Sequence, residues 1–268
     1  MRILLVAVGI AFVVWTPLAL AAPPLPNSIA AIGDSITQAA DVCCWYGDHP
    51  GQSWSTGDAW YDGIDSQYER ILAVKAGIRG HNYNDAKSGA RMRDVQAQAQ
   101  AAVAQQARYV TILMGANDVC TDSVATMTSV GDFTAQFSAA VSTLAAGLPS
   151  NSHVFVSSIP NVYRLRQLFH GNALAELVWS TAHICQSMLS ASNTEDDRQA
   201  VVSREQAFNQ VLRTVCGSYA FCRFDDNAVF DYPFSSGDVS KLDYFHPSIA
   251  GQAKLASITW ARSWWAAS

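Results

Sequence analysis

Charged side chains are scarce in this sequence. Lysine, arginine, aspartate and glutamate make up 15% of the 268 residues, the formal net charge is −5, and no stretch is rich in lysine or arginine. Proteins that bind the phosphates of nucleic acid carry clustered positive charge. The sequence therefore argues against a nucleic-acid partner.

Signals that divide a chain into parts are also absent. There is no internal repeat, no block of like charges and no low-complexity linker. Half of the residues are hydrophobic, which lets a chain of this length bury one sizeable core. We therefore expect a single domain over residues 22–268.

The N-terminus, in contrast, holds a long apolar run. Arg2 precedes unbroken apolar sequence over residues 3–15, and Ala-Leu-Ala at residues 19–21 fits the small-x-small rule for signal-peptide cleavage. This pattern predicts a signal peptide over residues 1–21, secretion, and a mature net charge of −6. The same segment is just long enough to span a bilayer, so an uncleaved anchor is the alternative.

An even number of cysteines in an exported chain indicates disulfides. The spacings contain no C-x-x-C pair, which argues against the alternative of a zinc site. We expect Cys216 to bond to Cys222, because this pair closes a short loop. Cys43 and Cys44 are adjacent, and a ring between neighbours is strained, so we expect them to bond to different partners. The six cysteines are Cys43, Cys44, Cys120, Cys185, Cys216 and Cys222.

Apolar segments of strand length alternate with segments that have helical character. Near-continuous apolar strands that alternate with helices are typical of a parallel sheet covered on both faces. The expected strands lie at residues 28–32, 109–114, 153–158 and 228–230. The expected helices lie at residues 92–107, 132–146, 203–215 and 248–265.

Two polar clusters follow strands of this predicted sheet. Residues 33–35 (Gly-Asp-Ser) follow the first strand, and residues 115–118 (Gly-Ala-Asn-Asp) follow the strand at 109–114. Ligands of open parallel sheets bind beyond the carboxyl ends of the strands. We therefore expect both clusters at the same edge of the sheet.

Ser35 and His246 are a candidate nucleophile and base. A serine hydroxyl reacts only when a base takes its proton, and Asp243, three residues before His246, is placed to fix the histidine tautomer. Each residue also has an ordinary alternative. Ser35 suits a helix N-cap, and His246 suits a surface loop next to a helix start.

An ester hydrolase also needs donors for the oxyanion of its tetrahedral intermediate. The backbone N–H groups of Ser35 and Gly89 and the side-chain amide of Asn117 are candidates for this oxyanion hole. The alternatives are an Asx-turn for Asn117 and a plain loop glycine for Gly89.

Together these residues form an ordered set that resembles a known family. GDSIT at residues 33–37, Gly89, GAND at 115–118 and DYFHP at 243–247 resemble the four blocks of the SGNH (GDSL) hydrolases. The resemblance implies a flavodoxin-like three-layer α/β/α fold and hydrolysis of esters without a cofactor or metal. It implies that Ser35 is the nucleophile, His246 the base and Asp243 the orienting acid. It also implies the oxyanion hole of Ser35, Gly89 and Asn117. The G-x-S-x-G nucleophile elbow of the α/β-hydrolases is absent.

A long irregular segment over residues 41–63 follows the nucleophile block and contains Trp45, Trp54 and Trp60. Its GQSWSTG portion, with GANDVC, is similar to the phospholipase B-like branch of the family, which implies an acyl-ester or phospholipid substrate. The similarity also implies that the three tryptophans line a groove for the acyl chain. The alternative is that they pack locally as structural residues.

The sequence thus predicts a secreted, monomeric serine esterase or lipase that acts on a small-molecule or lipid ester. Trp264 and Trp265 are candidates for a transient lipid contact, although a packed C-terminal helix is the simpler interpretation. The rival functions are a carbohydrate acetyl esterase and a secreted binding protein that keeps the fold without turnover.

Overall fold

Five strands form one parallel sheet in the computed structural model, which describes residues 22–266. The strand order is β2-β1-β3-β4-β5, and every neighbouring pair is parallel. The predicted signal peptide lies outside the described residues. The strands are β1 (Ile29–Gly33), β2 (Asn82–Asn84), β3 (Tyr109–Leu113), β4 (His153–Val156) and β5 (Cys222–Phe224).

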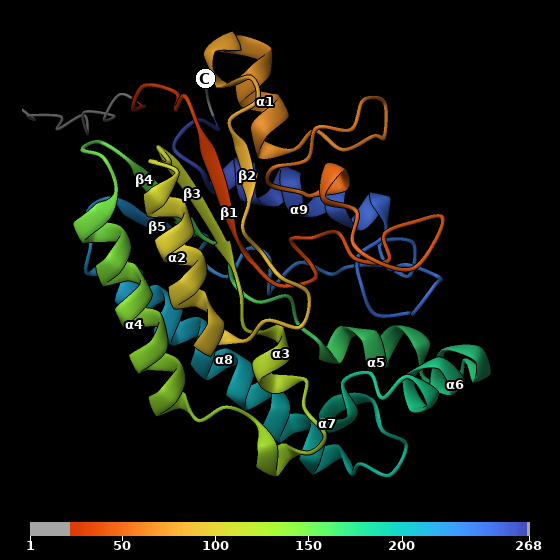
Figure 1. Ribbon diagram of the computed structural model, residues 1–268. Coiled ribbons are helices and arrows are strands. Elements are labelled where there is room, and N and C mark those ends of the chain that lie inside the picture. Colours follow the sequence, from red (N-terminus) through yellow and green to blue (C-terminus); the bar gives the residue numbers. More distant parts are fainter. Residues whose placement is uncertain (1–21, 267–268) are drawn as a thin grey trace, which may run out of the picture.

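Helices cover both faces of this sheet, which confirms the predicted three-layer arrangement (Figure 1). One face packs against α2 (Val95–Ala104), α4 (Val130–Gly147) and α8 (Glu195–Gly217). The other faces α1 (Gln67–Val74) and α9 (Ile249–Arg262).

Alternate residues of each strand enter the two layers, because successive side chains of a strand point to opposite faces. Ile32 and Ile112 belong to the larger apolar cluster, on the α2, α4 and α8 side. Ile29, Tyr109 and Phe155 belong to the smaller cluster, with side chains of α1. All five residues are completely buried. This burial on both faces explains why the central strands appear in the sequence as continuous apolar runs.

The two edge strands differ from the sequence expectation. The expected strand at 228–230 is wrong, since these residues lie in turns. The Asp225 carboxylate accepts hydrogen bonds from the N–H groups of Asn227 (3.0 Å) and Val229 (3.1 Å), and this local bonding folds the segment. The fifth strand is β5, just before it. Strand β2 was not predicted, because its Asn-Tyr-Asn sequence has no apolar pattern.

Local capping explains where the helices depart from their expected bounds. Helix α8 begins at Glu195, well before residue 203, because Thr194 and Asp197 form a capping box. Helix α9 begins at Ile249, one residue after the expected start, because Ser248 is its N-cap and accepts the Gly251 N–H, and it ends at Arg262. Four further helices were not predicted in the sequence and are short: α3 (Ala116–Val119), α5 (Tyr163–Phe169), α6 (Ala173–Thr181) and α7 (Gln186–Leu189). Helix α1 was also missed. Single 3₁₀ turns occur at Pro50–Gln52, Ala76–Ile78, Met92–Asp94 and Val124–Thr126.

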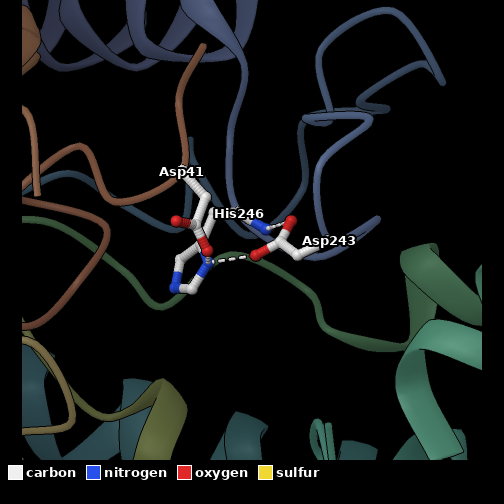
Figure 2. Close-up of side chains that lie close together, drawn as sticks. All are labelled: Asp41, Asp243 and His246. Carbon is white, nitrogen blue, oxygen red and sulfur yellow. Dashed lines mark hydrogen bonds and ion pairs between the residues drawn. The ribbon is translucent and has the colours of Figure 1, made fainter. Parts of the chain in front are cut away.

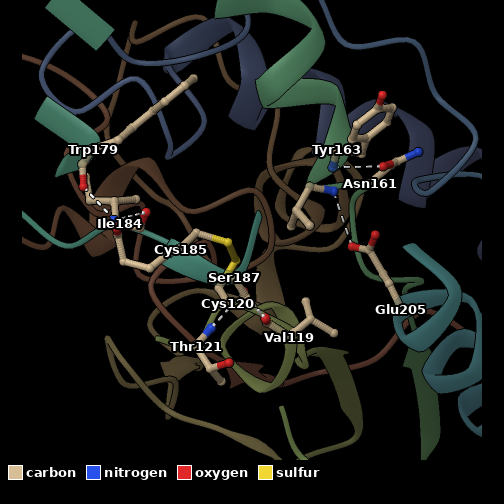
Figure 3. The surroundings of a disulfide bond; sticks show 12 residues. Val119, Cys120, Thr121, Asn161, Tyr163, Trp179, Ile184, Cys185, Ser187 and Glu205 are labelled. Atoms are coloured by element: carbon tan, nitrogen blue, oxygen red, sulfur yellow. Dashed lines mark hydrogen bonds between the residues drawn. A yellow bond between two sulfur atoms is a disulfide. The ribbon is translucent and has the colours of Figure 1, made fainter. Parts of the chain in front are cut away.

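Two disulfides link helices and strands of the described residues. The predicted Cys216–Cys222 bond is confirmed and links the end of α8 to β5. The second, Cys120–Cys185, links the end of α3 to the residue before α7 (Figure 3). Beside it, the Ser187 hydroxyl donates to the Val119 carbonyl at 2.6 Å, and the Ser187 N–H donates to the Thr121 carbonyl at 2.7 Å.

The expectation that Cys43 and Cys44 bond to different partners is wrong. The two disulfides use the other four cysteines, and the sulfur atoms of Cys43 and Cys44 lie 2.7 Å from each other without a bond between them. Among the described residues, no third free cysteine is left to pair with either of them. Across the part of the chain that the structure describes, no helix has the length and apolarity needed to cross a membrane.

Candidate active site

Ser35 lies two residues after the end of β1, at the carboxyl end of the sheet. The backbone that follows it forms turns, and the Oδ1 atom of Asp34 accepts the Ile36 N–H at 2.9 Å. No helix begins here, so Ser35 is not a helix N-cap. Residue 33 must be glycine for the turn to pack this closely against Thr37 and β3. A Cβ at this position would lie 2.4 Å from the Thr37 hydroxyl and 2.8 Å from the Leu113 carbonyl of β3.

The Ser35 hydroxyl meets a histidine from the far end of the chain. The distance between Ser35 Oγ and His246 Nε2 is 2.7 Å, although the residues are 211 positions apart. His246 Nδ1 lies 2.5 Å from Asp243 Oδ2. The other oxygen of Asp243 accepts the N–H groups of Phe245 (2.9 Å) and His246 (3.1 Å). In this order of contacts a carboxylate fixes the histidine tautomer, and the free nitrogen can take a proton from serine.

The loop that carries Asp243 and His246 is held by its own backbone. The Ser240 N–H donates to the His246 carbonyl at 2.8 Å, and Val239 bridges Pro247 in antiparallel fashion. Tyr244 has a φ of 57°, in the left-handed region, and its side chain is buried. This closed loop explains how a spacing of three residues brings the Asp243 carboxylate to His246, whose other ring nitrogen contacts Ser35.

Electrostatics favour a charged histidine at this position. Burial lowers the pKa of His246, but the hydrogen bond and charge of Asp243, together with Asp41 and Asp34, outweigh burial and raise the pKa above its ordinary 6.5. Burial opposes the charge of Asp243 too, yet its hydrogen bond to His246 leaves the pKa of Asp243 below 3.8. Asp243 therefore stays ionised where His246 titrates.

Asp34 is a further carboxyl at this edge. It is completely buried, which raises its pKa to about 7, while the Ile36 N–H and the charge of His246 act in the opposite direction. Its Oδ2 atom has no hydrogen-bond partner among the described residues. Asp34 thus titrates near neutral pH beside the reactive groups.

Two of the expected oxyanion donors, Gly89 and Asn117, lie in segments that follow β2 and β3. Asn117 lies in α3, directly after β3, and its side-chain amide donates to the Ala90 carbonyl at 3.0 Å. Gly89 precedes Ala90 and has a φ of 80°, which favours glycine. The Lys87 N–H donates to the Gly33 carbonyl at 3.1 Å and so ties this segment to the end of β1. Both predicted clusters therefore share one edge of the sheet.

Asp41 is a site residue that the sequence reasoning missed. Its Oδ2 atom lies 3.8 Å from His246 Nδ1, the ring nitrogen that Asp243 also contacts (Figure 2). Its Oδ1 atom accepts the Gly47 N–H at 2.6 Å, and its φ is 53°. Burial and the nearby charge of Asp243 raise the pKa of Asp41. No signal in the sequence separates this aspartate from its neighbours, because a turn places it.

Asp41, Asp243 and His246 have ligand atoms at metal-binding distances from one another. The ring nitrogens of His246, however, face Ser35 and Asp243. Both ring nitrogens therefore already have a partner within hydrogen-bond distance.

The three tryptophans of the 41–63 segment do not share one groove. Trp54 is completely buried, with its N–H groups donating to Gln252 (2.9 Å) and Thr37 (3.3 Å), so it is unavailable to a substrate. The expectation that Trp54 lines a substrate groove is therefore wrong, because its ring packs in the hydrophobic core. Trp45 is 67% exposed and Trp60 is 74% exposed. Neither lines the pocket that contains Ile36 and Phe245, the chain neighbours of Ser35 and His246.

Comparison with solved structures places the fold. The LAE5 enzyme, described as an alpha/beta hydrolase from the metagenome of Lake Arreo, Spain, has a TM-score of 0.56 and 18% identity over 91% of this chain and 96% of its own. The acetyl xylan esterase AlAXEase has a TM-score of 0.53 and 14% identity, over 87% and 98% of the two chains. A structure described as a GDSL-like lipase from Parabacteroides merdae has a TM-score of 0.51 and 16% identity, over 91% and 98%.

The sequence itself also matches a family. The comparison with curated proteins gave no match. The profile of the GDSL-like Lipase/Acylhydrolase family matches residues 29–258, which span the sheet, Ser35 and the loop of His246. The chain therefore belongs to the GDSL-like lipase/acylhydrolase family and is a carboxylic ester hydrolase.

Proposed function

We propose that this protein is a secreted serine esterase that cleaves carboxylic acyl esters through an acyl-enzyme on Ser35. The single observation that carries the proposal is the contact chain from Ser35 Oγ to His246 Nε2 (2.7 Å) and from His246 Nδ1 to Asp243 (2.5 Å). Such a chain supplies the nucleophile, the base and the orienting acid of a serine hydrolase.

The first half of the reaction forms the acyl-enzyme. Ser35 Oγ attacks the ester carbonyl while His246 Nε2 takes the hydroxyl proton. Negative charge then develops on the carbonyl oxygen, and the N–H groups of Ser35 and Gly89 with the Asn117 amide donate to it. His246 returns the proton to the leaving alcohol as the bond to that alcohol breaks.

The second half releases the acid. Water attacks the acyl carbon, His246 Nε2 takes its proton, and Ser35 leaves as an alcohol that recovers the proton. Asp243 keeps its charge throughout and stabilises the imidazolium that forms in both halves. The raised pKa of His246 makes it a stronger base, but only its neutral form accepts the proton.

The test is hydrolysis of p-nitrophenyl esters from acetyl to palmitoyl by the wild type and Ser35→Ala. We expect the variant to lose at least about 1,000-fold in kcat. The matched control is Ser180→Ala, which removes an exposed serine of α6 and should keep wild-type rates. A fluorophosphonate should label the wild type and Ser180→Ala, but not Ser35→Ala. Equal turnover by Ser35→Ala and wild type contradicts the proposal. Failure of the fluorophosphonate to label the folded wild type also contradicts it.

Secretion is part of the proposal and has a separate test. The leader pattern of residues 1–21 and the two disulfides support an oxidising, exported location. Sequencing of the N-terminus of protein recovered from the medium should begin at Ala22. Retention in the membrane with Met1 in place contradicts cleavage.

We propose a monomer, and light scattering should give a mass near that of one mature chain.

A carbohydrate acetyl esterase is the second candidate, favoured by the structural similarity to an acetyl xylan esterase. Hydrolysis of acetyl esters and of no longer acyl ester would indicate this function. A phospholipase is the finer alternative that the GQSWSTG portion suggests, and its sign is release of fatty acid from phospholipid vesicles.

A further inference from the structure

A pocket opens where the segments of the candidate active site meet. Ile36 follows Ser35, Ala116 precedes Asn117 and Phe245 precedes His246, and these three neighbours line one cavity of about 60 Å³. The Phe245 ring also packs edge-to-face against the His246 ring, with ring centres 5.0 Å apart. The cavity is therefore built on the same three segments as the reacting groups.

The opposite wall comes from α5, a helix that the sequence did not reveal. Leu165 and Leu168 of α5 line the pocket, and Phe234 and Leu255 add to its apolar surface. In Figure 1, α5 lies beyond the loops at the carboxyl end of the sheet. The side chains that face this space are thus mainly hydrocarbon.

The polar residues of the wall are tied to the protein itself. Arg164 Nε donates to the Phe234 carbonyl at 2.8 Å. The Asp238 carboxylate accepts from the N–H (2.8 Å) and the hydroxyl (2.7 Å) of Ser235. Asn161 Oδ1 accepts the Tyr163 N–H at 3.0 Å. A sugar hydroxyl or a phosphate that took one of these bonded atoms would displace its protein partner, whereas a hydrocarbon chain leaves the bonds intact.

The α5 wall is also fixed against the histidine loop. The Trp179 indole N–H of α6 donates to the Tyr244 carbonyl at 3.1 Å. The rings of Phe169 and Tyr244 pack edge-to-face with their centres 5.3 Å apart. The pocket is therefore held in shape before a ligand enters, which reduces the ordering cost of binding.

We propose that this pocket binds the acyl chain of the ester, and that it selects a short to medium aliphatic chain. This inference rests on the proposed serine mechanism. A water-sized group needs roughly 10–15 Å³ of cavity, so 60 Å³ holds about four to six methylene-sized groups. An acetyl group leaves most of the pocket empty, and a palmitoyl chain exceeds it. The preferred substrates are therefore esters of acids of about five to seven carbons, neither acetylated sugars nor long-chain phospholipids.

The test compares kcat/KM on p-nitrophenyl esters from acetate to palmitate. In the wild type each methylene that enters the pocket should raise kcat/KM about threefold to fourfold until the pocket is full. Leu165→Trp narrows the pocket and should lower the ratio of kcat/KM on hexanoate to kcat/KM on acetate at least about tenfold. Leu168→Ala widens it and should move the optimum to longer chains. Acetate turnover reports that each variant is folded.

Leu174→Trp is the matched control, because Leu174 lies on α6 and is 56% exposed, outside the pocket. It should keep the wild-type chain-length profile. An unchanged profile in both pocket variants, with acetate turnover intact, overturns the acyl assignment while the serine mechanism stands. A wild type that gains nothing beyond acetate also overturns it. Failure of the proposed function is distinct: no ester, acetate included, would then be cleaved in a Ser35-dependent way, and the pocket assignment falls with it.

Discussion

Asp41 Oδ2 lies 3.8 Å from Nδ1 of His246, the same nitrogen that Asp243 contacts at 2.5 Å. Two carboxylates thus flank one ring nitrogen, and Asp243 alone is within hydrogen-bond distance (Figure 2). The side chains of Asp41 and His246 are 17% and 15% exposed, so solvent screens their interaction only in part. Asp41 therefore acts on the charge of His246 rather than on its orientation.

Asp41→Asn should lower the midpoint of the acid limb in the pH profile of kcat/KM. The groups that face His246 are Asp34, Asp41 and Asp243, and removal of one negative charge favours the neutral ring. The amide oxygen of asparagine can still accept the Gly47 N–H, so the loop should keep its shape. We expect kcat on the plateau to change by less than about tenfold, because Asp243 keeps its contact.

The pH profile of the variant, measured beside the wild type and Asp58→Asn, checks this prediction. Asp58 lies on the same long segment but is exposed and has no contact with His246 among the described residues. An unmoved midpoint in Asp41→Asn, or an equal shift in Asp58→Asn, would rule out a local charge effect.

Wild-type activity should fall as the pH drops, with a midpoint above 6.5. Only neutral His246 takes a proton, and its raised pKa keeps it charged to higher pH than an ordinary histidine. Asp243→Asn removes the main partner that raises this pKa and also the acceptor that fixes the tautomer. We expect kcat to fall roughly 100-fold to 10,000-fold and the midpoint to move down. Steady-state rates from pH 5 to 9 would show both effects; a full-rate variant would exclude the role of Asp243.

Glu205 makes stability depend on pH. It is completely buried on α8, its Oε1 atom accepts the Val162 N–H at 3.3 Å, and its Oε2 atom has no partner among the described residues (Figure 3). Burial raises the pKa of Glu205 well above 4.5, so the folded protein binds this proton more tightly than the unfolded chain. The resulting stability is complete below pH 4.5 and is lost as the pH rises through the folded pKa.

Glu205→Gln should therefore flatten this dependence. The glutamine carbonyl can still accept the Val162 N–H, but no proton is lost as the pH rises. Denaturant unfolding at pH 5 and pH 9 should show a smaller decrease in the free energy of unfolding for the variant than for the wild type. An identical decrease in both proteins would mean that Glu205 is already ionised in the folded state.

The disulfide between Cys120 and Cys185 should stabilise more than the one between Cys216 and Cys222. Their sequence separations are 65 and 6, and the chain-entropy account gives about 4 kcal/mol for the longer loop and about 2 kcal/mol for the shorter. Paired alanine variants should show this order in thermal unfolding, with the larger loss of roughly 8–16 °C. The reverse order would indicate that strain or residual structure outweighs loop length.

The loss of Cys120–Cys185 should also affect turnover, because Cys120 directly follows the helix that carries Asn117. Assays well below the new melting temperature separate this effect from unfolding. Wild-type kcat in the folded variant would show that α3 is positioned without the bond.

Part of this protein was evident from local sequence. The apolar runs at 109–114 and 153–158 predicted β3 and β4, since a strand buried on both faces tolerates few polar residues. The short loop between Cys216 and Cys222 predicted their bond. The two polar clusters after β1 and β3 predicted a shared edge, because parallel strands end on the same side. Ser35, Asp243 and His246 followed from the order of the motifs.

Other features came only from tertiary structure. Strand β2 pairs with β1 although its own residues carry no strand pattern, because the sheet supplies its hydrogen bonds. Trp54 lies in the hydrophobic core and does not line a substrate groove. Its N–H groups donate to Gln252 and Thr37, which are distant from it in the sequence.

The sequence by itself determined the central strands, the order of the site residues and one disulfide, since these depend on local apolar pattern and short spacing. Tertiary structure alone decided that Asp41 lies beside His246 and that α5 closes a pocket next to Ser35. A left-handed turn and a helix docked on the histidine loop place these groups. Contacts between segments far apart in the chain leave no local trace in the residues that make them.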